Sequence, residues 1–430
     1  MIERYSMSPI KEIWTLEQQY KRWLEVEIAA VKACEEFEMA PKGISDKIRQ
    51  NAYINVDEIL EIESVVDHDV IAFIKGVTKN MGDEERYFHR GMTSSDVVDT
   101  ALALGIKEAG EHILKSLEEF YEILKEKSAS HKNTVNVART HGIHGEPSSF
   151  GLKLLSFLAE TERNIERFKK ALDEVSQGKI SGAVGNYANI DPEIEERALQ
   201  ILGLKCAKVS TQVVPRDVHA EFFSVLALIG ASIERIAVEI RHLQKTEVLE
   251  AQEPFRKGQR GSSAMPHKKN PIICERLTGM ARMLRSYAMT SYENIALWHE
   301  RDISHSSVER VFFPDATMIA FYMIEKIKYV MKDLIVNEDR MKETFERSYN
   351  LVYSQRVMLG LIEKGISREE SYKVVQECAL KAWDERKGFK ELLKNHPLIK
   401  EKISSDEIED FFENTYYLRN IDKVYKRFDI

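Results

Sequence analysis

Residues 261–271 read GSSAMPHKKNP, and their residue types could do chemistry on a carboxylate. Pro266 and Pro271 prevent a continuous helix there. A mobile loop that offers backbone N–H groups, hydroxyls and an ammonium group could close on a carboxylate and stabilise the negative charge that develops on it. The alternative is a solvated linker between helices. Long irregular stretches in compact domains are often functional, so we favour an active-site loop.

A second polar segment, TSSD at 93–96, has the pattern of a helix start. Thr93 followed by Asp96 three positions later is a capping box, which predicts a helix that continues through Val97. The N-terminus of a helix also presents free N–H groups and positive potential to an anion. Since Thr93 and Ser94 add hydroxyls, the segment is predicted to be a helix cap and an anion site at once.

A third segment, ARTHGIHGEP at 138–147, gathers Arg139, Thr140, His141 and His144 in a glycine-containing turn. One histidine alone is more often structural, but this cluster raises the odds of a polar site. The two histidines are three residues apart, as metal ligands on a helix would be. Because the glycines between and after them oppose a regular helix, we expect no metal site here.

The composition limits the elements that can position these segments. A chain of 430 residues exceeds one compact core, so two or three domains are expected. No stretch resembles a membrane span or a signal core, which predicts no membrane partner. The four cysteines are far apart without a CxxC pair, which favours a reducing cytoplasmic location. A net charge of −8 argues against nucleic acid as the main partner but leaves a small anionic ligand open.

Apolar residues recur in steps of three and four over several long stretches. The clearest stretch contains Phe222, Leu226, Ile229, Ile233, Ile236, Ile240 and Leu243. Similar patterns cover 154–172, 113–124 and 320–334, whereas no comparable period-two alternation occurs. A 3.5-residue repeat indicates long helices that bury one face against each other, in one chain or between chains. The sequence therefore predicts an all-α fold around a helix bundle.

The ends of the chain carry shorter helical segments than the middle. We expect three domains: an N-terminal helical domain over 1–92, a central long-helix bundle over 93–341 that carries the 261–271 loop, and a C-terminal helical domain over 342–430. One C-terminal helix is predicted to begin at Ser367, where Glu370 completes a capping box.

The 261–271 segment closely resembles the signature loop of the fumarase/aspartase superfamily, whose pattern is GSSxMPxKxNP. TSSD at 93–96 and RTHG at 139–142 match further conserved segments in order and spacing, and the resemblance spans essentially the whole chain. Within the superfamily the chain most resembles the adenylosuccinate lyase family. The supporting segments are RYSMSPI at 4–10, HDV at 68–70, STQVVPRD at 210–217, AMPHKKNP at 264–271 and ERDISHSSVER at 300–310.

This resemblance implies a carbon–nitrogen lyase of purine biosynthesis, without metal or organic cofactor. It would eliminate fumarate from adenylosuccinate, giving AMP, and from the succinylated aminoimidazole carboxamide ribotide, giving the carboxamide. Another fumarate-releasing lyase, such as an argininosuccinate lyase, and a catalytically silent scaffold are the alternatives. The segment 300–310 argues against the first alternative, and intact Ser262, His141, Lys268 and Glu275 argue against the second.

The resemblance also implies roles for particular side chains. Ser262 would be the general base, and Ser263 beside it is the less favoured candidate and would bind a substrate carboxylate. His141 would be the general acid, tuned by Glu275. His68 is the competing candidate for the acid, or it would bind the phosphate.

The remaining implied residues would bind substrate. Lys268 and Asn270 would hold the same carboxylate as Ser263. Contacts to the nucleotide, its ribose or its phosphate would come from Arg4, Tyr5, Gln212, Arg301, Ser306 and Arg310. Asp69, Thr93 and Ser94 complete the predicted set.

The resemblance also implies a homotetramer with a shared multi-helix core, in which each active site would draw on three chains. The sequence itself is consistent with this arrangement. His141 and Ser262 are separated by two stretches with helical patterns, 154–172 and 222–243, and a helix of 22 residues spans about 33 Å. One chain would therefore have difficulty bringing both residues to one site.

Overall fold

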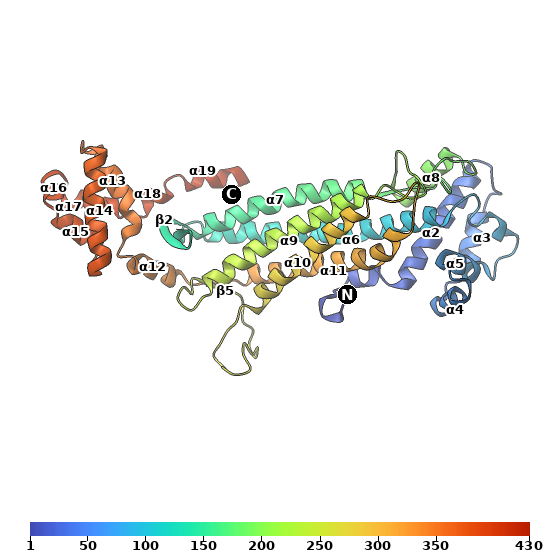
Figure 1. Cartoon of the computed structure of the whole chain (residues 1–430), viewed down its shortest axis with the longest axis horizontal. Helices are drawn as coiled ribbons and strands as arrows, with labels where there is room; N and C mark the ends of the chain where they lie inside the picture. The colour runs from blue at the N-terminus through green and yellow to red at the C-terminus, as the bar shows by residue number, and fades with distance from the viewer. The chain divides into compact units, whose positions relative to one another are not determined.

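The computed structural model describes residues 1–430, and helices dominate it (Figure 1). Its only sheets are three small ones of two strands each, and helices form the rest of the regular structure. The predicted all-α class is therefore confirmed. None of the helices combines the length and the apolar composition that a membrane crossing requires. The five long helices are α6 (Ser94–Ser130), α7 (Phe150–Val175), α9 (Asp217–Leu243), α10 (Ile272–Glu293) and α11 (Ser304–Lys332).

The chain forms two compact units, and each long helix contributes residues to both. Unit 1 comprises Met1–Glu119, Thr161–Glu234 and Leu277–Lys326. Unit 2 comprises Phe120–Glu160, Arg235–Arg276 and Ile327–Ile430. The three domains expected from the sequence stay a prediction.

The apolar repeats fall where long helices were predicted. All seven apolar residues of the clearest stretch lie on α9 and are buried. The other stretches fall on α7, α6 and α11, except that Leu334 lies two residues beyond α11. In unit 1, the Phe223 ring on α9 contacts the rings of Phe312 and Phe313 on α11, with centroids 4.4 and 4.8 Å apart. This aromatic packing fixes the first turns of α11 against α9.

Unit 1 also contains the N-terminal helices and a small parallel sheet. The elements are η1 (Glu3–Tyr5), α1 (Ile10–Ile13), α2 (Leu16–Glu36), α3 (Ile44–Asn51), α4 (Val56–Val66), α5 (Asp69–Thr78), η2 (Asp83–Tyr87), α8 (Pro192–Leu202), and β3 (Gln177–Gly178) paired with β4 (Lys205–Cys206). Their core packs Trp23 of α2 edge-on against Phe73 of α5, with ring centroids 5.3 Å apart.

In unit 2 an antiparallel hairpin joins β1 (Val135–Thr140) to β2 (Ile143–Ser149). His141 and Gly142 form its two-residue turn with φ angles of 54° and 77°, the combination of a type I′ turn. The sequence predicted a turn here but no strands. Gly145 and Pro147 interrupt the apolar alternation of β2, which explains why the pattern was not visible.

The rest of unit 2 consists of a second small sheet and short C-terminal helices. They are β5 (Ala251–Gln252) paired with β6 (Ile335–Val336), α12 (Glu338–Arg347), η3 (Leu351–Tyr353), α13 (Ser354–Glu363), α14 (Arg368–Glu385), α15 (Phe389–Asn395), α16 (Pro397–Lys402), α17 (Ser405–Phe411), α18 (Thr415–Leu418), α19 (Ile421–Tyr425) and η4 (Lys426–Phe428). As predicted, Ser367 caps α14, because its hydroxyl accepts a bond from the Glu370 amide. The predicted capping box is only half formed, since the Glu370 side chain does not accept a bond from the Ser367 amide.

A buried ion pair in unit 1 fixes the segment that leads into α6. Glu27 is fully buried on α2, and its carboxylate accepts bonds from the backbone N–H and the Nδ1 of His89, at 2.8 and 2.6 Å. Burial lowers the pKa of His89, but the hydrogen bond and charge of Glu27 outweigh it and raise that pKa above the usual value.

This raised pKa predicts a pH-dependent contribution to stability. The contribution is fully present below about pH 6.5, the ordinary histidine pKa, and is lost as the pH rises through the higher folded-state value. Glu27→Gln should therefore lower the free energy of unfolding most near pH 6, on the order of 1–3 kcal/mol, and less near pH 9. Urea denaturation at both pH values measures this. Glu58→Gln, which breaks a surface pair with Lys79, is the control whose effect should not change. An equal Glu27→Gln effect at both pH values would contradict the prediction.

Candidate active site

Unit 1 contains a cavity of about 890 Å³. Its walls come from the start of α2, the α4–α5 junction, the start of α6, the segment 212–216 and the residues around the start of α11. The cavity brings together eight residues that the sequence predicted as substrate contacts: His68, Asp69, Thr93, Ser94, Gln212, Arg301, Ser306 and Arg310.

The N-terminus of α6 forms one wall of the cavity. Thr93, Ser94 and Ser95 line it, and the Asp96 carboxylate accepts a bond from the Thr93 amide at 2.7 Å. This bond is one half of the predicted capping box. In the other half the Asp96 amide would donate to the Thr93 hydroxyl, but it donates to the Thr93 carbonyl instead, at 2.9 Å. The first amides of a helix lack intrahelical acceptors and carry positive potential, so this wall suits an anion.

Arg310 on α11 brings a guanidinium group to the cavity. It forms an ion pair with Asp69, the first residue of α5, and its Nε donates to the Ser306 hydroxyl at 3.4 Å. The Arg310 side chain is 56% exposed, so this pair adds little stability. The pair orients the guanidinium, which stays accessible to a ligand anion.

Arg301 provides a second cation in the cavity wall. Its Nη1 donates to the side-chain oxygen of Gln212 at 2.9 Å. Its Nε is buried and has no hydrogen-bond partner. Because buried donors are rarely left unpaired, we expect this N–H to gain an acceptor when the site is occupied.

His68 occupies the N-cap of α5 and also lines the cavity. Its Nδ1 accepts a bond from the Ile71 amide at 3.4 Å. In a neutral ring this leaves Nε2 as the N–H donor. His68 could therefore donate a hydrogen bond to an anion.

A buried ionic cluster in the cavity wall was not predicted as functional. Arg216 binds Asp99 and Glu309, each through two guanidinium nitrogens. Burial opposes ionisation of Asp99, but the Arg216 charge outweighs it and lowers the pKa of Asp99 to about 2. Burial, followed by the Arg216 charge, lowers the pKa of His305. Arg216 and Glu309 fall inside the segments 210–217 and 300–310 that support the family resemblance. Their place in these segments was the sequence feature that could have identified them.

Arg4 and Tyr5 lie in η1 of unit 1 and are absent from the cavity wall. The Tyr5 ring packs edge-on against Tyr322 of α11, with centroids 5.2 Å apart. Their predicted contact with the nucleotide stays a prediction.

In unit 2, His141 sits exposed at the tip of the β1–β2 hairpin. The strand beneath it is anchored by Arg139, whose guanidinium binds both carboxylate oxygens of the fully buried Glu250, at 2.9 and 2.6 Å. Thr344 also donates to Glu250, at 2.7 Å. Arg139 therefore holds the hairpin, and His141 remains free to meet a ligand.

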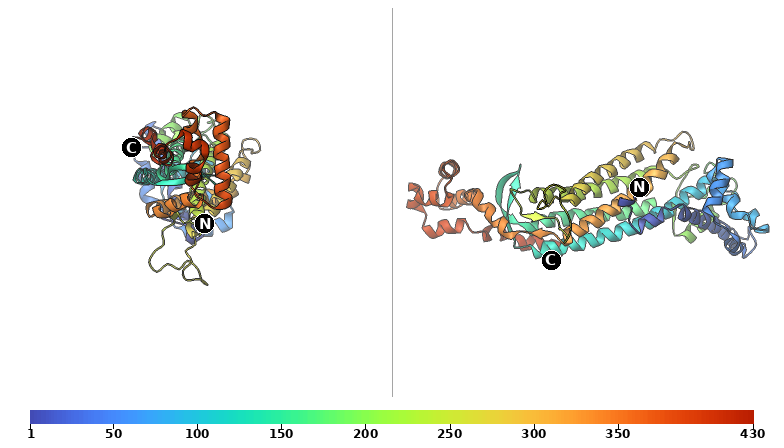
Figure 2. Two further views of the ribbon diagram at one scale, coloured as in Figure 1. Left: turned by 90° about the vertical axis from the view of Figure 1, so that its left-hand side faces the viewer. Right: turned by 90° about the horizontal axis from the view of Figure 1, so that it is seen from below.

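The signature loop, residues 261–271, follows β5 and projects from the helices of unit 2 (Figures 1 and 2). The Ser262 hydroxyl accepts bonds from the amides of Ala264 and Met265, at 3.2 and 3.0 Å. The Asn270 amide group donates to the Gly261 carbonyl at 2.9 Å and closes the loop. A Cβ at position 261 would lie 1.9 Å from the Lys268 carbonyl oxygen, so this close approach requires glycine.

The other predicted residues of unit 2 are accessible. Ser263 and Lys268 are exposed in the signature loop, and Glu275 is exposed on the first turn of α10. The start of α10 is held by Glu253, which accepts bonds from the amides of Ile273 and Cys274. The predicted action of Glu275 on His141 stays a prediction.

Comparison with known proteins agrees with the motifs. Residues 3–285 match the lyase family model, and residues 350–428 match the model described as adenylosuccinate lyase C-terminus. The chain is 56% identical to the adenylosuccinate lyase of Thermotoga maritima over 100% of both chains. It is 50% identical to that of Bacillus subtilis over 99% of both chains.

Solved structures share the fold. A fumarate lyase from Mesorhizobium superposes with a TM-score of 0.91 at 22% identity, covering 99% of both chains. A β-carboxy-cis,cis-muconate cycloisomerase from Acinetobacter calcoaceticus gives 0.89 at 22% identity, covering 98% of this chain and 97% of the other.

Proposed function

The chain belongs to the adenylosuccinate lyase family of the fumarase/aspartase superfamily, and from this premise we propose how its residues carry out the elimination. The enzyme is a carbon–nitrogen lyase that releases fumarate from adenylosuccinate and leaves AMP, a step of purine biosynthesis. The succinylated aminoimidazole carboxamide ribotide is the second proposed substrate. The full-length relationship to adenylosuccinate lyases carries this conclusion.

The cavity of unit 1 is the proposed binding site of the substrate. Adenylosuccinate has a phosphate at one end and two carboxylates at the other, so it needs several separate anion contacts. The amides of α6, the unpaired Arg301 Nε and the accessible Arg310 offer such contacts. Thr93, Ser94 and Gln212 add neutral hydrogen-bonding groups.

Ser262 is the proposed general base. It would remove the proton from the carbon beside one substrate carboxylate, and the resulting dianion needs nearby cations and N–H donors. A serine hydroxyl is a weak base, but two amides already donate to the Ser262 oxygen, which favours negative charge on it. Ser263, Lys268 and Asn270 would hold the carboxylate, which requires Asn270 to release the Gly261 carbonyl.

His141 is the proposed general acid. It would protonate the departing nitrogen as the carbon–nitrogen bond breaks, and the electron pair left by the proton forms the double bond of fumarate. Its exposed position at a rigid hairpin tip supports this role. Glu275 would tune His141, and His68, with Nε2 as its free donor, would bind the phosphate or compete as the acid.

A homotetramer with shared active sites is the proposed assembly. The cavity residues belong to unit 1, whereas Ser262, Lys268 and His141 belong to unit 2. Neighbouring chains would supply the acid and the base to each cavity, and Arg4 and Tyr5 would reach the nucleotide in the assembled site. The cytoplasm is the proposed location, because purine nucleotides are made there.

The proposal predicts strict substrate selection. Purified enzyme should cleave adenylosuccinate and show no detectable turnover of argininosuccinate, because the cavity contacts suit a nucleotide phosphate. An ultraviolet assay of both substrates, with aspartate and malate alongside, measures this. Cleavage of argininosuccinate without cleavage of adenylosuccinate would identify the alternative lyase. Inactivity on every substrate, in folded tetramer, would favour the silent scaffold.

A further inference from the structure

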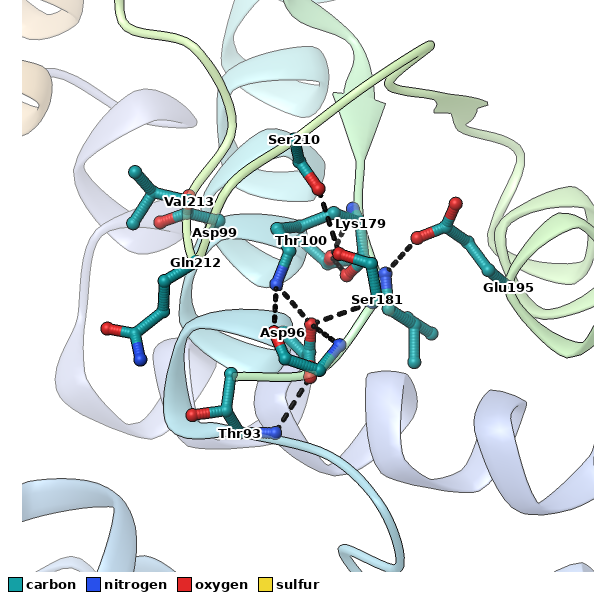
Figure 3. A network of polar contacts seen from close by, with 12 residues as sticks. Thr93, Asp96, Asp99, Thr100, Lys179, Ser181, Glu195, Ser210, Gln212 and Val213 are labelled. Atoms are coloured by element: carbon teal, nitrogen blue, oxygen red, sulfur yellow. Dashed lines mark hydrogen bonds and ion pairs between the residues drawn. The ribbon is translucent and has the colours of Figure 1, made fainter. Parts of the chain in front are cut away.

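A buried network in unit 1 joins the first turn of α6 to the loop 179–182 (Figure 3). Lys179 is fully buried, and its ammonium group forms an ion pair with the Asp96 carboxylate. The same Asp96 oxygen accepts bonds from the amides of Ser181 and Gly182, at 3.0 and 3.3 Å. The other Asp96 oxygen accepts from the Thr93 amide at 2.7 Å. Asp96 therefore carries four donors at the end of the helix that forms the cavity wall.

The network also reaches the segment that precedes the cavity residue Gln212. The Thr100 hydroxyl donates to the Lys179 carbonyl at 2.8 Å and accepts from the Lys179 amide at 3.1 Å. The hydroxyls of Ser181 and Ser210 lie 2.8 Å apart (Figure 3). Ser210 precedes the cavity residue Gln212 by two positions. Lys179 thus sits between two segments that line the cavity without lining it itself.

The charge of Asp96 poses an electrostatic problem. A carboxylate in the first turn stabilises the N-terminus of a helix, since it satisfies amides and complements the helix dipole. The same negative charge, buried directly behind Thr93 and Ser94, would repel any anion that binds to the free amides there. In a poorly solvated position such repulsion is only weakly screened. An opposite charge beside Asp96 removes the conflict.

We propose that Lys179 is a positioning residue that neutralises Asp96, so that the α6 N-terminus can bind an anionic group of the substrate. Asp96 then keeps the cap and the 179–182 loop in place while the helix end retains its positive potential. Buried ion pairs are weak contributors to net stability, so stability alone does not account for this one. The inference rests on the proposed function, in which the cavity binds the substrate.

The test measures the affinities of AMP, fumarate and adenosine by calorimetry on the intact tetramer. Lys179→Met should weaken the anion held at α6 by about 10-fold to 100-fold, as expected for a like charge within several ångströms. Adenosine, which lacks the phosphate, should change less than about threefold. If AMP weakens, the phosphate lies at α6, and if fumarate weakens, a carboxylate does. Adding Asp96→Asn to Lys179→Met should restore most of the anion affinity, because both charges are then absent.

Glu195→Gln is the matched control. The Glu195 carboxylate is buried and anchors the same loop through the Ile180 amide, but it does not line the cavity. This variant should leave all three affinities within about threefold. If Lys179→Met fails to fold, the electroneutral double variant decides, since the inference predicts anion affinity close to that of the wild type.

The inference is overturned by unchanged anion affinity in Lys179→Met, or by an equal loss of affinity for adenosine, which would indicate a merely structural role. A loss of more than tenfold in the double variant would overturn it as well. The variant Arg310→Ala distinguishes a failure of the Lys179 inference from a failure of the proposed function. If Arg310→Ala also leaves AMP and fumarate affinity unchanged, the cavity is not the substrate site.

Discussion

Ser262→Ala is expected to lower kcat by roughly 10²–10⁴-fold, the usual contribution of a general base. The Ser262 oxygen already accepts two amide bonds, so these donors are positioned to stabilise the alkoxide form of Ser262 that takes up the substrate proton. Removing a group that acts in the transition state lowers kcat and kcat/KM together and leaves ligand binding largely intact. Steady-state kinetics with adenylosuccinate and direct binding of AMP measure both quantities.

Ser263→Ala is the matched control, since Ser263 is the adjacent serine of the same loop. It should raise KM through a lost carboxylate contact and lower kcat far less than Ser262→Ala. If Ser263→Ala abolishes turnover while Ser262→Ala is mild, the two serines have the reverse roles. A collapse of AMP binding in Ser262→Ala would instead indicate that the loss of its two turn bonds disorders the site.

The long helices were largely predictable, because the residues that a helix buries recur in the sequence every three or four positions. The α9 residues from Phe222 to Leu243 show a period of three and four, and all seven are buried. The β1–β2 hairpin was not predictable from such a pattern. Gly145 and Pro147 interrupt the apolar alternation of β2, and the I′ turn depends on the local conformation of His141 and Gly142 rather than on apolar periodicity.

The candidate site was predictable where a motif marks a polar group that lines the cavity, as with Thr93, Ser94 and Arg310. It was not predictable where a charge is buried. Lys179 stands in a glycine-rich stretch without P-loop spacing, and nothing in the sequence pairs it with Asp96, 83 residues earlier. Such pairs depend on tertiary packing, since a buried charge is tolerated only beside a partner that the fold brings to it.

Mixing two inactive variants is expected to restore activity. His141→Ala lacks the proposed acid and Ser262→Ala lacks the proposed base, so each tetramer alone should be nearly inactive. Both residues belong to unit 2, and the proposed assembly takes them from different chains for each site. In randomly mixed tetramers, about one site in four would then receive an intact His141 from one chain and an intact Ser262 from another.

The experiment dissociates an equal mixture of the two variants, reassembles it and compares its rate with that of each variant treated alone. Recovery toward about a quarter of the wild-type rate supports shared sites, because no single chain in the mixture carries both residues. A mixture of His141→Ala with His141→Ala/Ser262→Ala is the control, since no arrangement of those chains supplies the acid. If native mass spectrometry confirms mixed tetramers and activity does not recover, each site takes His141 and Ser262 from the same chain. The hairpin tip and the signature loop would then have to meet within unit 2, and the cavity would receive both from one neighbour.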